Sequence, residues 1–483
     1  MLEAALLIDS AAVYASDGET FERIDPVSHE VSTRASAASV EDAVRAANAA
    51  ARAFPAWSTT PPSERREKLN EAARILLERT GDFTEAMIAE TGATMGWAEF
   101  NCRLAASIIR EAAAMATQAT GEVIPSERPG SFAMAIRQPC GVVYSMAPWN
   151  APVILSARSV AMPLALGNTV VLKGSELCPR THGLLGEVLN AAGLPKGCVN
   201  VIHSSPEKAP EIVEALIAHP AVRRVNFTGS TRVGRMIAEK AARHLKRCLL
   251  ELGGKAPLIV LDDADIDAAV DAAVFGAFFH QGQICMSTER IVIDEKVADV
   301  FVEKFRVRAD RIRAGDPRDP ACILGAMITE QAAQRVKGLI NDAEMKGAVL
   351  VTGGRQEGVF VDPAILDHVS PAMRIYHEES FGPVASIVRV SGDDEAVSVA
   401  NDTEYGLAAA IFSRDVGRAL IIAQRLETGI CHINSATIHD EPQMPFGGVK
   451  ASGYGRFGGK AGIDEFTELR WITIQQGENR YPF

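Results

Sequence analysis

Apolar residues recur in blocks along this chain, and the spacing inside each block predicts its secondary structure. Alanines at helical spacing predict a helix that opens at Ser39, a good N-cap residue, and continues to about Phe54. A second helix is predicted to begin at 61–63 and to stop at Gly81. A further helical region is predicted over about 83–118. These helices precede the first regular alternation of strands and helices.

From Gly141 onward, short apolar strands alternate with helices. The strands are predicted at 142–146, 169–172, 199–203, 222–227 and 248–252. Such repeated β-α units indicate a parallel sheet with helices on its faces, and ligands of these sheets collect at the carboxyl ends of the strands. A second α/β run follows the pair Gly253-Gly254, where we place a domain boundary. Its strands are predicted at 258–261, 290–293, 384–390, 408–412 and 430–434.

Two strands remain outside both runs. Residues 131–138 alternate weakly between apolar and polar side chains, and the tail at 466–475 forms a strand with a large aromatic residue, Trp471. A terminal strand needs a partner, so the two are expected to pair with each other. Together they are predicted to form an arm that docks on another subunit.

Composition narrows the functional classes. A chain of 483 residues with 47% apolar residues can bury two or three cores. The formal net charge of −12 and the lack of a basic run argue against binding to nucleic acid or to an acidic membrane surface. The first nine residues have no basic region typical of a signal peptide. The most apolar stretch, 152–172, contains Arg158 and Pro163 and is predicted to form a helix, a turn and a strand, not a membrane span.

The cysteines indicate a reducing compartment. None of the eight forms a CxxC pair, and no Cys/His cluster has zinc-finger spacing, so we expect no metal site. A chain of this length needs no disulfide staples, and a cytoplasmic location is predicted.

One cysteine stands apart by its position. Cys285 lies on a tight connection between a helical run that ends near Gly282 and the strand predicted after Glu289. Reactive groups often lie on such loops, which a rigid scaffold aims. Most other cysteines lie in apolar segments that indicate core thiols. A nucleophilic thiol needs nearby positive potential, which backbone N–H groups or a bound cation can supply. We interpret Cys285 as the nucleophile.

Polar residues lie at the carboxyl ends of several of the predicted strands or just beyond them. Glu251, before two glycines, is a candidate base, with a structural ion pair or a helix cap as the alternative. Asn150 is either a helix N-cap or a hydrogen-bond donor to an oxyanion. Lys173 and Glu176 are either a ribose-binding pair or a solvated pair that caps the next helix. If the two residues bind a ribose, the Glu176 carboxylate would repel a 2′-phosphate, which favours NAD over NADP.

Three further features carry weaker signals. The small-residue turn at 228–234 opens a helix and is either a phosphate-binding turn or an ordinary capped turn. His280 is near enough in sequence to pair with Cys285, although a packed or solvent-facing histidine is the alternative. For Trp97 and Phe100, a role in core packing is favoured over contact with a substrate.

Together these stretches resemble the aldehyde dehydrogenase superfamily across nearly the whole chain. The matching stretches are Pro148-Trp149-Asn150, Lys173 with Glu176, Phe227-Thr228-Gly229-Ser230-Thr231, Leu250-Glu251-Leu252-Gly253-Gly254-Lys255, Gly282-Gln283-Ile284-Cys285, Glu378-Glu379-Ser380-Phe381-Gly382-Pro383 and Pro445-Phe446-Gly447-Gly448-Val449-Lys450-Ala451-Ser452-Gly453. Their order and spacing both fit. A slight departure is Gly174, where many members carry a larger residue.

The resemblance implies a mechanism. Cys285 attacks the aldehyde carbonyl, and Asn150 with the Cys285 N–H stabilises the oxyanion. Hydride transfer to the nicotinamide leaves a thioester, and Glu251 activates water to hydrolyse it. The residues implied to bind NAD are Trp149, Lys173, Glu176, Gly229, Ser230, Leu252, Glu379 and Phe381.

The resemblance also implies an α/β fold with a Rossmann-type NAD-binding domain, an α/β catalytic domain and a small β oligomerisation arm. We therefore expect the NAD-binding domain at 1–120 and 141–252 and the catalytic domain at 253–464. The arm is expected at 121–140 and 465–483. Members are usually dimers or tetramers, so a homodimer or a homotetramer is expected here.

Less specific segments resemble the salicylaldehyde and vanillin dehydrogenase branch. They are 131–141, 283–290 and 459–466. This resemblance implies an aromatic aldehyde as the substrate. We expect Arg158 to face the ring substituents, with a surface or interdomain salt bridge as the alternative, and the apolar walls are expected to include Trp97, Phe100, Ile284 and Met286.

Other functions compete with this one. Aliphatic aldehydes or semialdehydes are alternative substrates. In a CoA-acylating enzyme, CoA would resolve the thioester in place of water, and the presence of Glu251 argues against this. A cysteine hydrolase that uses Cys285 and His280 would act without a nicotinamide, and a non-enzymatic protein on the same fold would leave the intact site unexplained.

Overall fold

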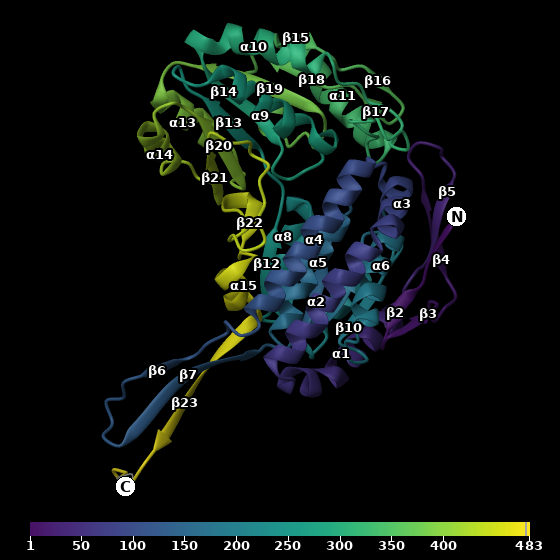
Figure 1. Cartoon of the computed structure of the whole chain (residues 1–483), viewed down its shortest axis with the longest axis vertical. Coiled ribbons are helices and arrows are strands. Elements are labelled where there is room, and N and C mark those ends of the chain that lie inside the picture. The colour runs from purple at the N-terminus through teal and green to yellow at the C-terminus, as the bar shows by residue number, and fades with distance from the viewer. Residues whose placement is uncertain (479–480) are drawn as a thin grey trace.

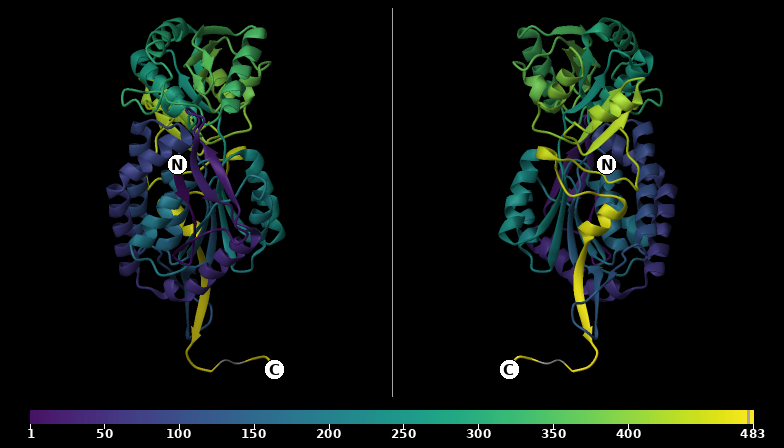
Figure 2. Two further views of the ribbon diagram at one scale, coloured as in Figure 1. Left: turned by 90° about the vertical axis from the view of Figure 1, so that its right-hand side faces the viewer. Right: turned by 90° about the vertical axis from the view of Figure 1, so that its left-hand side faces the viewer.

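The computed structural model describes residues 1–478 and 481–483; residues 479–480 of the predicted arm lie outside the described residues. Two α/β bodies stand one above the other, and a narrow arm extends below the lower body (Figures 1 and 2). The predicted fold class, two α/β domains with a β arm, is confirmed.

The lower body contains an eight-stranded sheet in the order β22-β12-β11-β8-β9-β10-β2-β3, whose five central strands are parallel. Its strands are β2 (Leu6–Ile8), β3 (Ala11–Val13), β8 (Val142–Met146), β9 (Thr169–Lys173), β10 (Val199–Ile202), β11 (Val222–Thr228), β12 (Arg247–Glu251) and β22 (Gly453–Tyr454). The five strands predicted after Gly141 are thus confirmed to within about one residue at each end. Beside this sheet, β1 (Leu2–Ala4), β4 (Thr20–Ile24) and β5 (Val31–Ser36) form a small sheet of their own.

Helices cover both faces of the first sheet (Figure 1). One face packs against α1 (Val40–Thr59), α7 (Ala209–Ala218) and α8 (Thr231–Arg243). The other packs against α5 (Pro152–Ala165) and α6 (Pro179–Ala191), with α2 (Pro62–Glu78), α3 (Thr80–Thr91) and α4 (Met95–Met115) outside them.

The predicted helix boundaries needed three corrections. Helix α1 does not end at Phe54 but runs through Pro55 to Thr59, because the buried Trp57 anchors the last turn by donating a hydrogen bond from Nε1 to the Leu164 carbonyl at 3.1 Å. Gly81 does not end a helix, since it lies in the first turn of α3. The region 83–118 is two helices, because Gly92 adopts a left-handed φ of 68° between them.

The upper body contains a seven-stranded sheet in the order β15-β18-β19-β14-β13-β20-β21, parallel except at β15. Its strands are β13 (Ala256–Val260), β14 (Thr288–Asp294), β15 (Val349–Thr352), β18 (Ala364–Asp367), β19 (Val384–Val390), β20 (Ala408–Phe412) and β21 (Ile430–Ile433). One face carries α9 (Ile266–Phe278) and α10 (Glu295–Ala309). The other carries α11 (Glu330–Met345), α12 (Arg374–His377), α13 (Asp393–Asn401) and α14 (Val416–Ala423). A two-stranded sheet is formed by β16 (Gln356–Glu357) and β17 (Phe360–Val361).

The arm consists of three antiparallel strands, β23-β7-β6. They are β6 (Glu122–Ile124), β7 (Ser131–Pro139) and β23 (Thr467–Gln475), and α15 (Gly459–Phe466) leads into the last. The predicted pairing of the tail with 131–138 is confirmed, and it runs in register from Thr467 opposite Pro139 to Gln475 opposite Ser131.

The domain limits remain predictions. Part of the predicted catalytic segment returns to the lower body, because β22 pairs with β12 in the first sheet and α15 contacts α4 and α5. Within the described residues, every helix is too short or too polar to span a membrane.

Candidate active site

Cys285 lies on a tightly folded loop between α9 and β14. A turn of 3-10 helix, Phe279–Gly282, follows α9, and within it His280 and Gln281 take left-handed φ values of 49° and 56°. A β-carbon on Gly282 would lie 2.1 Å from the Gly382 carbonyl oxygen, so only glycine fits there. Two consecutive left-handed residues without glycine cost free energy and are characteristic of functional loops.

The thiol of Cys285 lies between two cavities. The first, of about 310 Å³, opens at the carboxyl ends of β8, β11 and β12 and contacts both bodies. The second, of about 510 Å³, lies between α4, α5 and the loop at 435–446. Cys285, Asn150 and Leu155 line both. A reacting atom beside Cys285 therefore faces one cavity on each side.

Glu251 ends β12 and lines the first cavity together with Cys285. It is 1% exposed, and neither carboxylate oxygen has a hydrogen-bond partner within the described chain. Burial raises the pKa of Glu251 to about 8. The alternatives of an ion pair or a helix cap are thus wrong for this residue, and an unpartnered carboxyl group beside a thiol is typical of a base.

The segment that follows Glu251 lies close to the loop that carries Cys285, and a glycine, Gly254, is at the point of contact. A β-carbon on Gly254 would lie 2.4 Å from the Cys285 carbonyl oxygen. The chain after Glu251 therefore contacts the cysteine loop backbone to backbone, which explains why glycine follows the β12 strand end.

The Cys285 thiol is held in its neutral form by its surroundings. Burial raises the pKa of this thiol well above its usual range, and the carboxylates of Glu251 and Glu379 raise it further. The chain alone therefore favours a protonated thiol at neutral pH, and activation needs a positive charge nearby.

Asn150 is not the N-cap of α5, so that alternative is wrong. The helix begins at Pro152 with Ala151 as its cap residue. The Asn150 amide instead donates a hydrogen bond from Nδ2 to the Gln283 carbonyl at 2.9 Å, which leaves its second N–H free. The Cys285 backbone N–H has no partner within the described residues. Asn150 and Cys285 line the same two cavities, and each has a backbone or side-chain N–H group without a partner within the described residues.

The first cavity collects most of the residues expected to bind the dinucleotide. Those lining it are Trp149, Gly229, Ser230, Leu252, Glu379 and Phe381. Ser230 caps α8 without a side-chain hydrogen bond, so the N–H groups of the first helical turn are available to an anion. Burial raises the pKa of Glu379 to about 7, and its Oε1 accepts a hydrogen bond from the Gly254 N–H at 2.9 Å.

Lys173 and Glu176 lie beside this cavity and not in its lining. Lys173 is the last residue of β9, the strand next to β8 in the sheet, and Glu176 lies three residues beyond it. The Lys173 ammonium is buried, and its one hydrogen bond to a described residue reaches the Gly174 carbonyl at 3.4 Å. Burial lowers the pKa of Lys173 and the Glu176 carboxylate opposes this. A buried ammonium with so few acceptors fits the hydroxyls of a ribose, so these residues and the first cavity together fit a dinucleotide.

A buried ion pair supports the loop that carries Glu379 and Phe381, and the sequence patterns did not identify it. The Lys255 ammonium lies 2.7 Å from Glu289 Oε2, and both side chains are buried. Glu289 Oε1 accepts hydrogen bonds from the backbone N–H groups of Ser380 and Phe381 at 2.9 and 3.1 Å. Phe381 takes a left-handed φ of 48° and packs edge-on against Trp149, with ring centroids 5.7 Å apart.

The second cavity brings together all five residues expected to contact the substrate. They are Trp97, Phe100, Arg158, Ile284 and Met286. Trp97 and Phe100 also stack on each other, with centroids 5.6 Å apart, so they serve packing and cavity wall at once. The sequence patterns missed Phe279, Ile438, Asp440 and Phe446, which also line this cavity.

Arg158 forms the salt bridge that was its alternative role. Its Nη2 lies 2.7 and 2.6 Å from the two carboxylate oxygens of Asp440, and its guanidinium carbon lies 4.3 Å from the centre of the Phe446 ring. Both charged side chains line the second cavity and are largely buried, at 6% and 11% exposure. The pair thus presents one cation and one anion to a molecule in this cavity.

His280 does not pair with Cys285, so the dyad reading is wrong. Its ring stacks on Trp97 with centroids 4.5 Å apart and lines neither cavity. Burial lowers the pKa of His280 to about 3, which keeps the imidazole neutral. The His280 ring therefore packs against Trp97 in the aromatic wall of the second cavity.

Comparisons with known proteins agree with this geometry. Residues 13–472 match the model of the aldehyde dehydrogenase family. A vanillin dehydrogenase of Pseudomonas fluorescens is 60% identical over 482 residues, which cover 100% of both chains. A salicylaldehyde dehydrogenase of Pseudomonas putida is 52% identical over 483 residues, also 100% of both. The crystal structure of a salicylaldehyde dehydrogenase from Pseudomonas putida G7, complexed with salicylaldehyde, superposes with a TM-score of 0.98 at 51% identity over 100% of both chains.

Proposed function

Because this chain belongs to the aldehyde dehydrogenase family, we propose that it oxidises an aromatic aldehyde to its carboxylic acid with NAD as the acceptor. That it is an aldehyde dehydrogenase, an oxidoreductase that uses a nicotinamide dinucleotide, follows from the family and from its full-length relatives. The aromatic ring and the choice of NAD over NADP are the proposal. The position of Cys285 carries it, between a cavity lined by most of the residues expected to bind the dinucleotide and a cavity with aromatic walls.

The residues act in two stages. In the first, the Cys285 thiol loses its proton to solvent water and its sulfur adds to the aldehyde carbon. Asn150 Nδ2 and the Cys285 N–H donate hydrogen bonds to the oxygen that becomes negative. When bound, the dinucleotide supplies a positively charged ring that accepts the hydride of this carbon. The product of this stage is a thioester on Cys285.

In the second stage, Glu251 accepts a proton from water, and the hydroxide formed attacks the thioester carbon. The carbon–sulfur bond breaks, the acid leaves and the thiol is restored. The unpartnered, buried carboxyl group of Glu251 suits this role, since a pKa of about 8 makes it a strong enough base near neutral pH. A base beside the thioester also favours water over CoA as the second nucleophile.

An aldehyde panel tests the proposal. Purified protein is given benzaldehyde, salicylaldehyde, vanillin, hexanal and succinic semialdehyde, each with NAD and with NADP, and absorbance at 340 nm is followed. We expect kcat/KM to be highest for the aromatic aldehydes with NAD. Preference for hexanal or the semialdehyde would favour aliphatic substrates, and a strict need for CoA would favour acyl transfer.

Arg158→Met tests recognition of the ring substituents. The pair with Asp440 lines the cavity, so its charges offer hydrogen bonds to a ring hydroxyl that benzaldehyde lacks. We expect KM for salicylaldehyde and vanillin to rise about tenfold and that for benzaldehyde to change less than about twofold, as one charge-assisted hydrogen bond would require.

The lone Asp440 left by this change is itself destabilising, since breaking a buried pair strands a charge. The double variant Arg158→Met/Asp440→Asn removes that charge and serves as the control. An equal rise in KM for all three aldehydes in both variants would mean that the pair is structural only.

Glu176→Gln tests the choice of dinucleotide. Removing this carboxylate from the strand end beside Lys173 removes its repulsion of a 2′-phosphate. We expect the ratio of kcat/KM for NAD to that for NADP to fall roughly fivefold to tenfold. Glu64→Gln, an equal loss of charge on α2, should leave the ratio unchanged; an unchanged ratio in Glu176→Gln as well would rule out this role.

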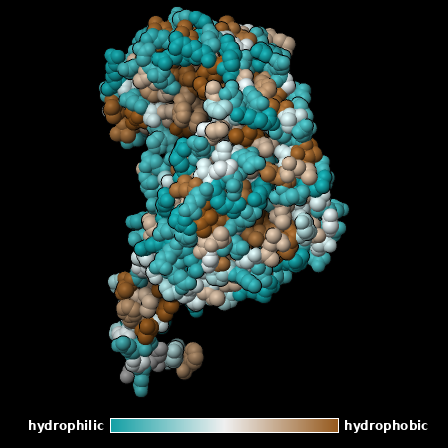
Figure 3. Space-filling model, turned by 45° about the vertical axis from the view of Figure 1, so that its right-hand side comes forward, coloured by the Kyte–Doolittle hydropathy of each residue, from teal (hydrophilic) through white to brown (hydrophobic). Residues whose placement is uncertain are grey.

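The arm supports a homodimer or a homotetramer. It extends from the lower body and carries exposed apolar side chains (Figure 3), among them Val123, Leu469 and Trp471 at 69%, 63% and 77% exposure. Such a surface is typical of a subunit interface. Light scattering after gel filtration measures the mass.

All eight cysteines are free thiols, in keeping with the predicted cytoplasmic location.

A further inference from the structure

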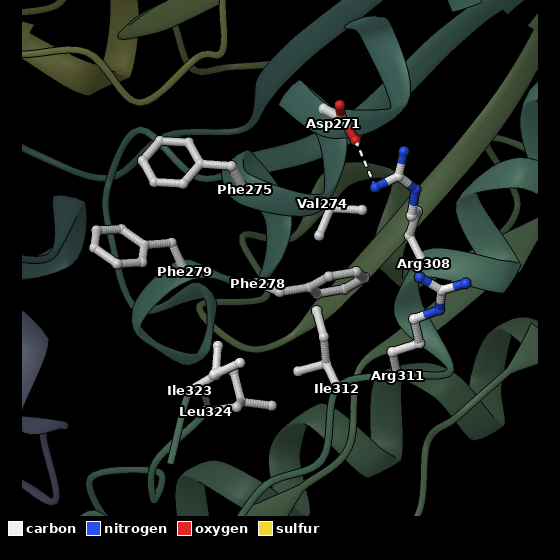
Figure 4. A pocket seen from close by; sticks show the side chains of 10 residues that line it. All are labelled: Asp271, Val274, Phe275, Phe278, Phe279, Arg308, Arg311, Ile312, Ile323 and Leu324. Carbon is white, nitrogen blue, oxygen red and sulfur yellow. Dashed lines mark ion pairs between the residues drawn. The ribbon is translucent and has the colours of Figure 1, made fainter. Parts of the chain in front are cut away.

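A third cavity lies next to the substrate cavity and takes no part in the mechanism above. We call it the outer cavity; its volume is about 360 Å³. It lies between α9, the end of α10 and the segment at 323–324 (Figure 4). Its lining residues are Asp271, Val274, Phe275, Phe278, Phe279, Arg308, Arg311, Ile312, Ile323 and Leu324. A single substituted benzene ring fits a space of this size.

The outer cavity has an aromatic side and a cationic side. The rings of Phe275 and Phe279 stack with centroids 4.8 Å apart, and in Figure 4 they lie across the cavity from Arg308 and Arg311. Phe278 lies between the two sides in this view and is buried. A molecule that matches both sides has an aromatic body and an anionic group.

The two arginines differ in how far they are already neutralised. Arg308 lies 3.3 Å from Asp271, but both side chains are about half exposed, at 47% and 61%, so this ion pair is weak. Arg311 is exposed, and its side chain has no ion pair or hydrogen bond to another described residue. The cavity therefore has a net positive charge, which complements a carboxylate and repels a cation.

Two of the aromatic residues connect this cavity with the site of reaction. Phe275 and Phe279 line both the outer cavity and the substrate cavity. Phe279 also packs edge-on against Trp97, with centroids 5.1 Å apart. A ring bound in the outer cavity would press against these shared side chains and restrict their rotamers. The occupancy of one cavity is thus coupled to the shape of the other.

We propose that the outer cavity binds an aromatic monocarboxylate, the class of compound that the reaction forms, and that its occupancy slows oxidation of the aldehyde. The aromatic ring lies against Phe275, Phe278 and Phe279, and the carboxylate accepts hydrogen bonds from Arg311 and Arg308. The identity of this compound as the product rests on the proposed function. The binding itself rests only on the aromatic and cationic walls.

Binding is measured directly, without turnover, on the full enzyme. The probe is 4-fluorobenzoate, followed by ¹⁹F NMR line broadening in the wild type, in Arg311→Gln and in Arg313→Gln. Arg313 is an exposed arginine two residues away that does not line the cavity, and it loses the same charge. We expect the affinity to fall about fivefold or more in Arg311→Gln and to stay unchanged in Arg313→Gln. Equal affinity in all three proteins would overturn the proposal.

Inhibition is measured beside binding, with benzoate added at saturating benzaldehyde. We expect benzoate to lower kcat of the wild type and of Arg313→Gln, and about fivefold more benzoate to be needed in Arg311→Gln. The values of kcat and KM without benzoate should agree among the three proteins, since Arg311 touches neither cavity at Cys285. Equal inhibition in all three would show that benzoate acts at the substrate cavity alone and would remove the regulatory role.

These results separate the two proposals. If no aromatic aldehyde is oxidised, the proposed substrate is wrong, while the NMR comparison still decides whether the outer cavity binds an aromatic carboxylate. If aromatic aldehydes are oxidised and Arg311→Gln changes neither binding nor inhibition, the outer cavity proposal fails alone.

Discussion

Cys285→Ala is expected to lower kcat for every aldehyde by roughly a thousandfold or more. The reason is that no other nucleophile lines both cavities. The structure brings only Cys285, Asn150 and Leu155 to the place where the two meet, within the described residues. An amide and an aliphatic side chain cannot form the covalent adduct that the first stage needs. Initial rates with benzaldehyde and NAD measure the loss.

The control separates chemistry from folding. Cys140→Ala removes another partly buried thiol, one that lies between β7 of the arm and β8 of the lower body and lines neither cavity. We expect it to retain the rate of the wild type. Both variants should still bind NADH, since the proposed ligands of the dinucleotide are unchanged. A Cys285→Ala protein that binds NADH and still oxidises aldehydes at more than a few per cent of the wild-type rate would contradict the covalent mechanism.

The strands could be predicted because parallel, buried strands are continuous apolar runs. The bounds of β19 and β20 match the prediction, since polar residues or turns flank both runs. The arm pairing followed from the need of a terminal strand for a partner. Helix ends were harder: a long-range anchor, Trp57, carries α1 through Pro55, and no local pattern reveals such a contact.

The site could be predicted in part, because parallel strands end at one edge and bring distant residues together. Glu251 and Ser230 line the first cavity for that reason. Nothing in the sequence around Asn150 distinguishes it from a helix N-cap residue. Its amide is held by a hydrogen bond to the Gln283 carbonyl, 133 residues away in the sequence, and no local pattern reveals that contact. Asp440 lies in a loop with no periodicity, so its pairing with Arg158 depends on the folded chain alone.

Glu251→Gln is expected to give a burst of about one NADH per active site, followed by a steady rate lower by roughly a hundredfold or more. The first stage does not use this carboxylate as a base for water, so the thioester forms. The second stage lacks its base, and the thioester accumulates. Stopped-flow absorbance at 340 nm measures both phases. Equal loss of the burst and of the steady rate would mean that Glu251 is needed before the thioester.

The pH dependence of the steady rate is a second, independent test of Glu251 as the base. The pKa of Glu251 is raised to about 8 because the carboxyl group is buried. The base is the ionised form, which is the minor form below pH 8 and falls about tenfold per pH unit at lower pH. The steady rate of the wild type should therefore rise between about pH 6 and pH 8 and level off above, while that of Glu251→Gln should lack this rise. In a second test, the variant is given one equivalent of aldehyde per active site with NAD, so that the burst consumes the aldehyde, and hydroxylamine is added afterwards. Hydroxylamine attacks a thioester without a base, so it should form an aromatic hydroxamate and release the Cys285 thiol. If no hydroxamate forms, no thioester waits on Cys285.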